Sequence, residues 1–134
     1  MISEPTRWLA VLALAGVGGV IFGGWALLTF IAGERRLSAG QVRFFRAGHA
    51  HAGVLLVLSL VCLRYLPETG FSNGLRWAAG LTLLSGVLAQ SGGFFLHLAA
   101  ADLDKPSPGT KLTRLGAALI AIGLSSLGLG LAIA

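Results

Sequence analysis

Four long apolar runs constrain the fold of this chain more than any other feature of its sequence. They lie near residues 8–32, 47–63, 77–101 and 115–134, and each approaches or exceeds the ~20 residues that a helix needs to cross a bilayer. Helices are favoured because a chain in lipid must satisfy its backbone hydrogen bonds internally. The sequence therefore predicts an all-α fold, an integral membrane four-helix bundle in which residues 1–134 form a single four-span domain.

Composition and charge indicate the partners of such a chain. Hydrophobic residues make up 55% of the sequence and charged residues 11%, which is typical of membrane proteins. The net charge of +5 comes from Lys and Arg that cluster between the apolar runs, so it indicates lipid headgroups and not nucleic acid. We expect contact with the lipid bilayer, no nucleic acid, and assembly as a homo-oligomer or as a subunit of a membrane complex.

The same cations predict an orientation. The first connection holds four Lys or Arg and the third holds three, which makes seven, against three on the other side of the membrane. The seven are Arg35, Arg36, Arg43, Arg46, Lys105, Lys111 and Arg114, and the three are Arg7, Arg64 and Arg76. Short loops rich in Lys and Arg stay in the cytoplasm. We therefore expect a multi-pass protein of the cell (inner) membrane with both termini non-cytoplasmic.

Three histidines are the candidate functional residues. His49 and His51 open the second run and His97 closes the third, so an antiparallel pair of helices would bring all three to the cytoplasmic end. Neutral imidazole is the commonest metal-binding side chain, and ionisable groups in membrane spans are candidates for function. The pattern predicts a metal site at His49, His51 and His97, or a haem held by His51 and His97.

Helix geometry separates the two histidines of the second run. His49 and His51 point about 200° apart, so only one of them can share a centre with His97. The face of His49 also carries Gly53, which permits a close helix contact and suits a bare ion. The face of His51 also carries Leu55, whose apolar side chain suits a haem. Both choices stay open at this stage.

Small residues predict which helix faces pack together. Five small or polar residues of the third run recur at helical steps, namely Thr82, Gly86, Gln90, Gly93 and His97. This face should point into the bundle, with Gly92 turned about 100° away from it. Glycines at steps of three, four or seven predict packing faces on the first and fourth runs as well: Gly16, Gly19, Gly23, Gly116, Gly123 and Gly130.

Two other classes of protein find no support in the sequence. A hydrolase is not indicated, because Ser125 and Ser126 lie in the far half of the fourth run, away from every histidine. A proton-coupled exporter needs a carboxylate within the membrane. The acids instead lie at or beyond the ends of the runs, and they are Glu4, Glu34, Glu68, Asp102 and Asp104.

The segment "FRAGHAHAGVLLVLSLVCLRYLP", residues 45–67, combines a basic residue, a His-x-His pair, a Leu-rich helix and a closing Tyr-Leu-Pro. This combination resembles short membrane proteins related to the catalytic subunit of haem–copper oxidases. The resemblance implies that His49 or His51 is a haem ligand. Three histidines are too few for the haems and copper of such an enzyme, so oxygen reduction by this chain alone is excluded.

Together these features lead to two hypotheses of function. The first is a small polytopic membrane protein whose histidine cluster binds haem b or a transition metal ion, as an accessory component of electron transfer. The alternative is a cofactor-free structural or oligomeric membrane protein, in which the histidines form hydrogen bonds with the backbone or water near the interface.

Overall fold

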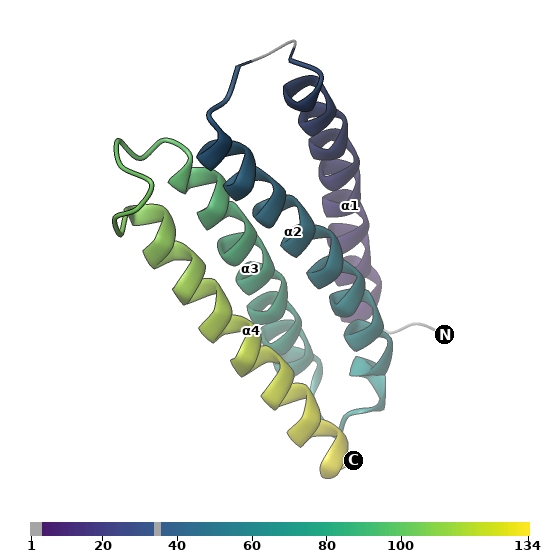
Figure 1. Cartoon of the computed structure of the whole chain (residues 1–134). Coiled ribbons are helices and arrows are strands. Elements are labelled where there is room, and N and C mark those ends of the chain that lie inside the picture. The colour runs from purple at the N-terminus through teal and green to yellow at the C-terminus, as the bar shows by residue number, and fades with distance from the viewer. Residues whose placement is uncertain (1–3, 34–35) are drawn as a thin grey trace.

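The computed structural model describes residues 4–33 and 36–134, which form a bundle of α helices (Figure 1). The helices are α1 (Glu4–Ile31), α2 (Ala39–Tyr65), α3 (Asn73–His97) and α4 (Pro108–Ala132), and a short 3-10 helix, η1 (Leu66–Glu68), extends α2. All four α helices are long and apolar enough to cross a membrane, so the predicted all-α membrane bundle is confirmed. Glu34 and Arg35, counted above among the acids and cations of the first connection, lie outside the described residues.

Serine side chains set where three of the helices begin. The Ser38 hydroxyl accepts a hydrogen bond from the Gln41 amide at 3.2 Å, and the Gln41 side chain accepts one from the Ser38 amide at 3.0 Å. This reciprocal capping satisfies donors that the first turn would leave free. Consequently α2 begins at Ala39, ahead of the apolar run that begins near residue 47. Ser107 caps α4 by the same reciprocal bonding, with Thr110, and the Ser72 hydroxyl caps α3 by accepting from the Leu75 amide at 3.4 Å.

The helix ends also differ from the edges of the apolar runs. After α1, Gly33 has a φ of +79°, a left-handed conformation that glycine adopts without steric cost and that ends helices. Helix α3 ends at His97, although the apolar run continues to Ala101. The Ala100 amide bonds the His97 carbonyl in a turn, so the last alanines belong to the connection.

Helices α3 and α4 pack backbone against backbone. A Cβ added at Gly86 would lie 2.7 Å from the Ile120 amide nitrogen, and one at Gly93 would lie 2.6 Å from the Gly109 carbonyl oxygen. Contacts this close tolerate only glycine, as in other membrane helix pairs. A Cβ at Gly92 would meet nothing within 4 Å, so the predicted inward face of α3 is confirmed at Gly86 and Gly93.

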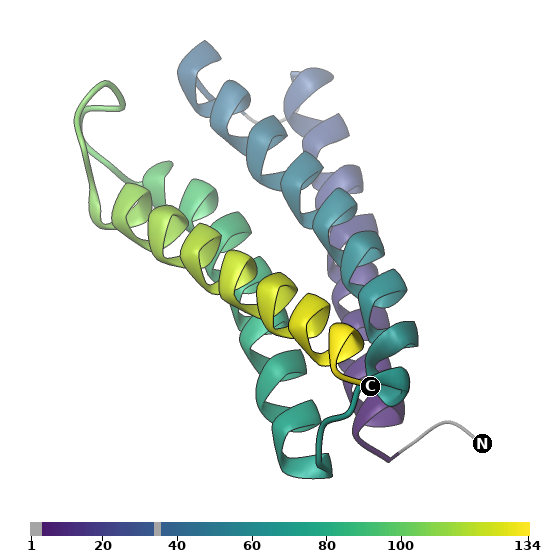
Figure 2. The same cartoon turned by 90° about the horizontal axis from the view of Figure 1, so that it is seen from below.

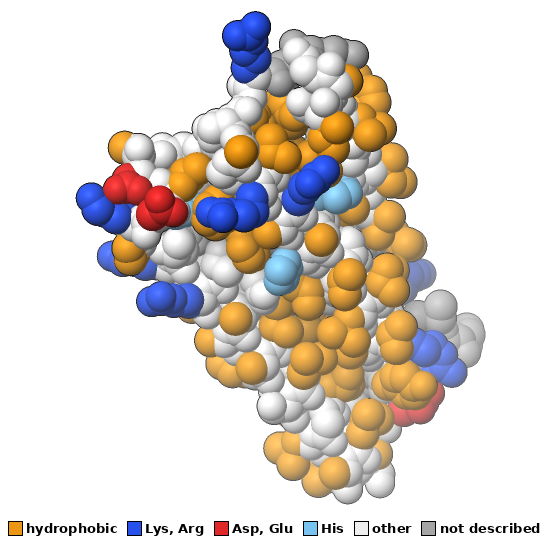
Figure 3. Space-filling model, in the orientation of Figure 1, with side chains coloured by type: hydrophobic (Ala, Val, Ile, Leu, Met, Phe, Trp, Pro, Cys, Tyr) orange, Lys and Arg blue, Asp and Glu red, His pale blue; other side chains and the backbone are white. Residues whose placement is uncertain are grey.

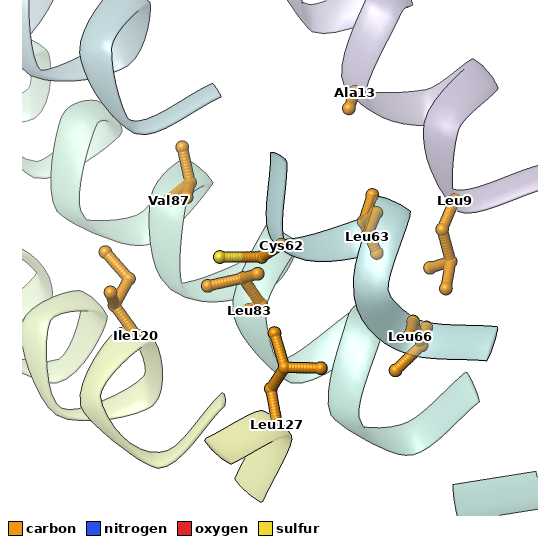
Figure 4. Packing of buried hydrophobic residues seen from close by; sticks show 9 residues of the cluster. All are labelled: Leu9, Ala13, Cys62, Leu63, Leu66, Leu83, Val87, Ile120 and Leu127. Atoms are coloured by element: carbon orange, nitrogen blue, oxygen red, sulfur yellow. The ribbon is translucent and has the colours of Figure 1, made fainter. Parts of the chain in front are cut away.

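The helices form two pairs, α1 with α2 and α3 with α4, which converge near the chain termini (Figures 1 and 2). Helix α2 also contacts α3 at the other end, where the rings of Phe45 and Phe95 lie 5.2 Å apart. The buried hydrophobic core lies where the pairs converge (Figure 4). It consists of Leu9, Ala13, Cys62, Leu63, Leu66, Leu83, Val87, Ile120 and Leu127. We call this end of the bundle the termini end.

The opposite end carries the two connections at 32–38 and 98–107, and we call it the basic end. Its described cations are Arg36, Arg43, Arg46, Lys105, Lys111 and Arg114. Figure 3 shows Lys and Arg gathered toward the two ends, with a broad hydrophobic surface between them. This distribution is typical of a protein whose middle contacts lipid.

Candidate functional site

His97 is a structural residue with both ring nitrogens engaged. Its side chain is 2% exposed, Nδ1 lies 2.6 Å from the Ser107 Oγ, and Nε2 lies 3.0 Å from the Leu103 carbonyl oxygen. A carbonyl only accepts, so Nε2 donates its hydrogen to Leu103. The Ser107 oxygen already accepts from the amides of Gly109 and Thr110, so its own hydrogen points to Nδ1. The neutral ring is thus fully bonded, which leaves no nitrogen for a metal.

His51 lies on the exposed side of α2. Its Nδ1 is 2.8 Å from the Ala47 carbonyl oxygen one turn earlier, and its ring centre is 4.9 Å from that of Phe94 on α3. Because a carbonyl only accepts, Nδ1 carries the hydrogen in this bond. The ring therefore offers Nε2 alone to any ligand, on the outer surface of the bundle.

His49 lies between α1 and α2, against two glycines. A Cβ added at Gly23 would be 3.3 Å from Nδ1, and one at Gly24 would be 3.5 Å from Nε2. Glycine at these two positions lets the ring pack on the backbone of α1. Within residues 4–33 and 36–134, neither ring nitrogen of His49 has a hydrogen-bond partner. The His49 side chain is half-buried, so its ring nitrogens are open to a partner from outside the described chain.

The structure does not bring the three histidines together. The ring of His97 packs at 4.4 Å from that of Phe44, whereas His51 lies about 10 Å further along the axis of α2 by its rise per residue. His49 faces α1, away from both. Among the residues that the structure describes, no three His, Cys, Asp or Glu side chains are placed to hold a metal ion. The expected pairing of His51 with His97 stays a prediction that this geometry does not support.

An apolar groove of about 510 Å³ opens between α1 and α3, with α2 as its floor, and we call it the α1–α3 groove. Its lining comprises Leu12, Ala13, Gly16, Gly19, Val20 and Gly23 from α1, His49, Ala52 and Leu56 from α2, and Leu81, Leu84, Ser85, Val87, Leu88, Ser91, Gly92 and Phe95 from α3. The groove therefore runs along the membrane-spanning part of the helices and includes His49.

Helices α1 and α3 contact each other near the termini end, and the groove opens beyond this contact. There Leu9, which is fully buried, packs against Gly80, where an added Cβ would lie 3.2 Å from the Leu9 Cγ. Toward the basic end α1 packs on α2 instead, where a Cβ added at Gly16 would lie 3.1 Å from the Leu56 Cδ1. The predicted packing face on α1 is thus wrong at Gly19, where an added Cβ would meet nothing within 4 Å.

Polar groups in the groove are few and lack partners. Ser91 is 5% exposed, and its hydroxyl oxygen has no hydrogen-bond partner in the described parts of the chain. It lines the groove together with His49, and Ser85 is the other hydroxyl there. Among the residues that the structure describes, no Lys, Arg, Asp or Glu lines the groove. The groove thus combines apolar walls with an unpaired imidazole and an unpaired hydroxyl.

Ser91 was not among the residues that the sequence singled out. Ser85, Leu88, Gly92 and Phe95 recur at helical steps of three and four, and Ser91 lies beside this second stripe. The stripe could have been found from its small residues. Its role could not, because an open face toward α1 depends on the angle between the helix pairs.

Comparisons with known proteins find no match. No family model, no curated protein and no solved structure is similar to the chain. The chemistry of the α1–α3 groove is therefore the basis on which a ligand can be assigned.

Proposed function

We propose that this protein binds one lipid-soluble molecule within the membrane, in the α1–α3 groove. The observation that carries the proposal is His49, an imidazole with two unpartnered nitrogens beside a groove of about 510 Å³. Unpaired polar groups within the hydrocarbon region cost free energy unless a partner satisfies them. A bound molecule supplies that partner and fills the space between α1 and α3.

The orientation of the protein in the membrane and its wider role are part of the same proposal. The basic end faces the cytoplasm of the cell (inner) membrane, and both termini face away from it; the excess of Lys and Arg supports this orientation. The protein acts as an accessory component of electron transfer, as a homo-oligomer or a subunit of a membrane complex. Support for electron transfer comes from the resemblance of residues 45–67.

Haem is the second candidate for the bound molecule, and His49 is the observation that favours it. A haem could take one ring nitrogen of His49 as its axial ligand, and the groove offers apolar walls. Support for a haem bound by two histidines is lacking, because His97 uses both nitrogens for Ser107 and Leu103. In the described part of the chain, the groove also lacks Lys and Arg that would bond the acidic side chains of a haem. For these two reasons haem is the second candidate for the bound molecule.

The cofactor-free alternative also has support. His97 bonds protein groups with both nitrogens, and His51 bonds a carbonyl of its own helix. Both patterns are those of histidines that serve structure. His49 and the groove beside it are what favour a binding function over this alternative.

Two glycines of α1 provide a matched test. Gly18 and Gly19 both have open space where a Cβ would lie, but only Gly19 lines the groove. We expect a lipid-soluble molecule to be extracted with organic solvent from purified parent protein and from Gly18→Leu, and to be lost from Gly19→Leu. Mass spectrometry and an absorption spectrum identify the molecule, and a haem spectrum would select the second candidate. Identical extracts from the two variants would contradict the proposal.

A further inference from the structure

Two residues with unpaired polar groups line the α1–α3 groove from different helices. His49 belongs to α2 and Ser91 to α3, and neither has a described hydrogen-bond partner. A neutral imidazole has one donor and one acceptor nitrogen, and a serine hydroxyl donates one hydrogen and accepts others. A ligand that satisfies both must offer polar atoms in two directions.

The head of the ligand is uncharged. A carboxylate or phosphate head would need a cation within the low-dielectric groove, because isolated charges are costly there. Within residues 4–33 and 36–134, neither Lys nor Arg lines the groove, and neither does an acidic residue that could pair a cationic head. Fatty acids and phospholipid headgroups therefore match this lining poorly.

The remainder of the groove fits a long apolar chain. From the level of His49 and Gly23, the described lining continues along α1 to Ala13 and along α3 to Leu84 and holds no Lys, Arg, Asp or Glu. The path from Gly23 to Ala13 is about 15 Å by the helical rise. An added Cβ at Gly19 would meet nothing within 4 Å, so a flexible chain has room beside this residue.

We infer that the ligand is a prenylated quinone or quinol, with its ring between His49 and Ser91 and its chain directed toward the termini end. A quinone ring is uncharged and carries two carbonyl oxygens on opposite sides, which suits donors from two helices. The acceptor nitrogen of His49 can bond the hydroxyl of the reduced ring. An alcohol with a single hydroxyl has fewer polar atoms to offer the two side chains. This inference rests on the proposed function of the groove.

The test compares two probes that share a chain and differ in the ring. Decyl-benzoquinone and decylbenzene are added to the detergent-purified full chain, and the rise in unfolding temperature with probe concentration gives an apparent Kd. We expect tighter binding of the quinone. Each of His49→Phe and Ser91→Ala should weaken quinone binding up to about tenfold, as for one lost hydrogen bond, and leave decylbenzene unchanged. His51→Phe is the matched control, because His51 lies outside the groove.

The outcomes separate the inference from the proposed function. Equal affinity for the two probes, with no effect of His49→Phe and a loss in Gly19→Leu, would overturn the quinone and keep the groove as a site. Equal responses of Gly18→Leu and Gly19→Leu to both probes would overturn the site itself. A change of oligomeric state in Gly19→Leu with unchanged binding would place a helix of a second copy in the groove, and would overturn both.

Discussion

At the residue scale, the three histidines show how a hydrogen-bond partner decides what a side chain can do. His97 donates to a carbonyl and receives the Ser107 hydroxyl hydrogen, so it joins the end of α3 to the start of α4. The Nδ1 of His51 donates a hydrogen bond to the Ala47 carbonyl oxygen. His49 has no described partner and faces the groove. Only His49 therefore combines a free imidazole with a space that could hold a ligand.

The role of His97 can be tested by truncation. We expect His97→Ala to lower stability by about 1–3 kcal/mol, because it leaves the Leu103 carbonyl and the Ser107 hydroxyl without their partner in a buried place. His51→Ala should change stability by about 0.5 kcal/mol or less, as for other exposed positions. Thermal unfolding in detergent measures both. Equal losses would contradict the structural role of His97.

The sequence predicted part of this residue-scale picture. It separated His49 from His51 by about 200°, and the structure places them on different neighbours, α1 and α3. It also placed all three histidines at one level, which the structure does not support. Helix periodicity fixes the direction of a side chain but not the offset between two helices, which depends on connections and close packing.

At the element scale, glycine decides how closely each helix pair packs. Helices α3 and α4 meet at backbone distance along Gly86, Gly93, Gly116 and Gly123, whereas α1 touches α3 mainly through Leu9. The sequence predicted glycine faces on three helices, and the face on α1 is the one that stays partly open. Periodicity identifies a helix face made of small residues, but it does not tell whether another helix or a ligand covers that face.

The close packing of α3 on α4 predicts a difference between neighbouring glycines. Gly93→Leu would force a side chain into the backbone of α4 near Gly109, which costs typically about 1–3 kcal/mol through overpacking. Gly92→Leu points into open space and should be tolerated. Thermal unfolding in detergent should therefore show a clear loss for Gly93→Leu alone. A similar loss in both variants would contradict the assigned face.

The contact between α1 and α3 rests on Leu9. Because Leu9 is fully buried against Gly80, Leu9→Ala should cost about 2–5 kcal/mol and loosen α1 from the bundle. Leu14, also on α1, is 57% exposed, so Leu14→Ala removes little packing and serves as the control. Thermal unfolding and the rate of proteolysis within α1 measure the effect. Unchanged unfolding in Leu9→Ala would mean that α1 is held by α2 alone.

At the scale of the whole molecule, the fold was predicted and the groove was not. Four apolar runs are sufficient to predict four spans, because a chain in lipid has few other ways to satisfy its backbone. The angle between the two helix pairs has no comparable signal. It follows from the tight glycine contact of α3 with α4 and from the close approach of α1 to α3 where Leu9 meets Gly80.

The orientation of the bundle is the last prediction, and the structure indicates where to test it. Ser38, Ser72 and Ser107 are exposed or half-exposed but cap helices, so changing them would disturb α2, α3 and α4. Exposed alternatives nearby are Ala39, Ala101 and Asn73. Single cysteines at these positions, in a chain with Cys62→Ala, can be labelled with a membrane-impermeant maleimide.

We expect Asn73→Cys to react in intact cells, and Ala39→Cys and Ala101→Cys to react only after the membrane is opened. The reason is the excess of cations at the basic end, which keeps the two basic connections in the cytoplasm. At the termini end, Arg64 pairs with Glu68 at 2.7 Å and Arg76 bonds the carbonyls of Pro67 and Thr69, so two of its three cations are partly compensated. The reverse labelling would invert the orientation and place the His49 end of the groove on the outer side. Labelling of Ala39 and Asn73 on the same side would contradict the four-span fold itself.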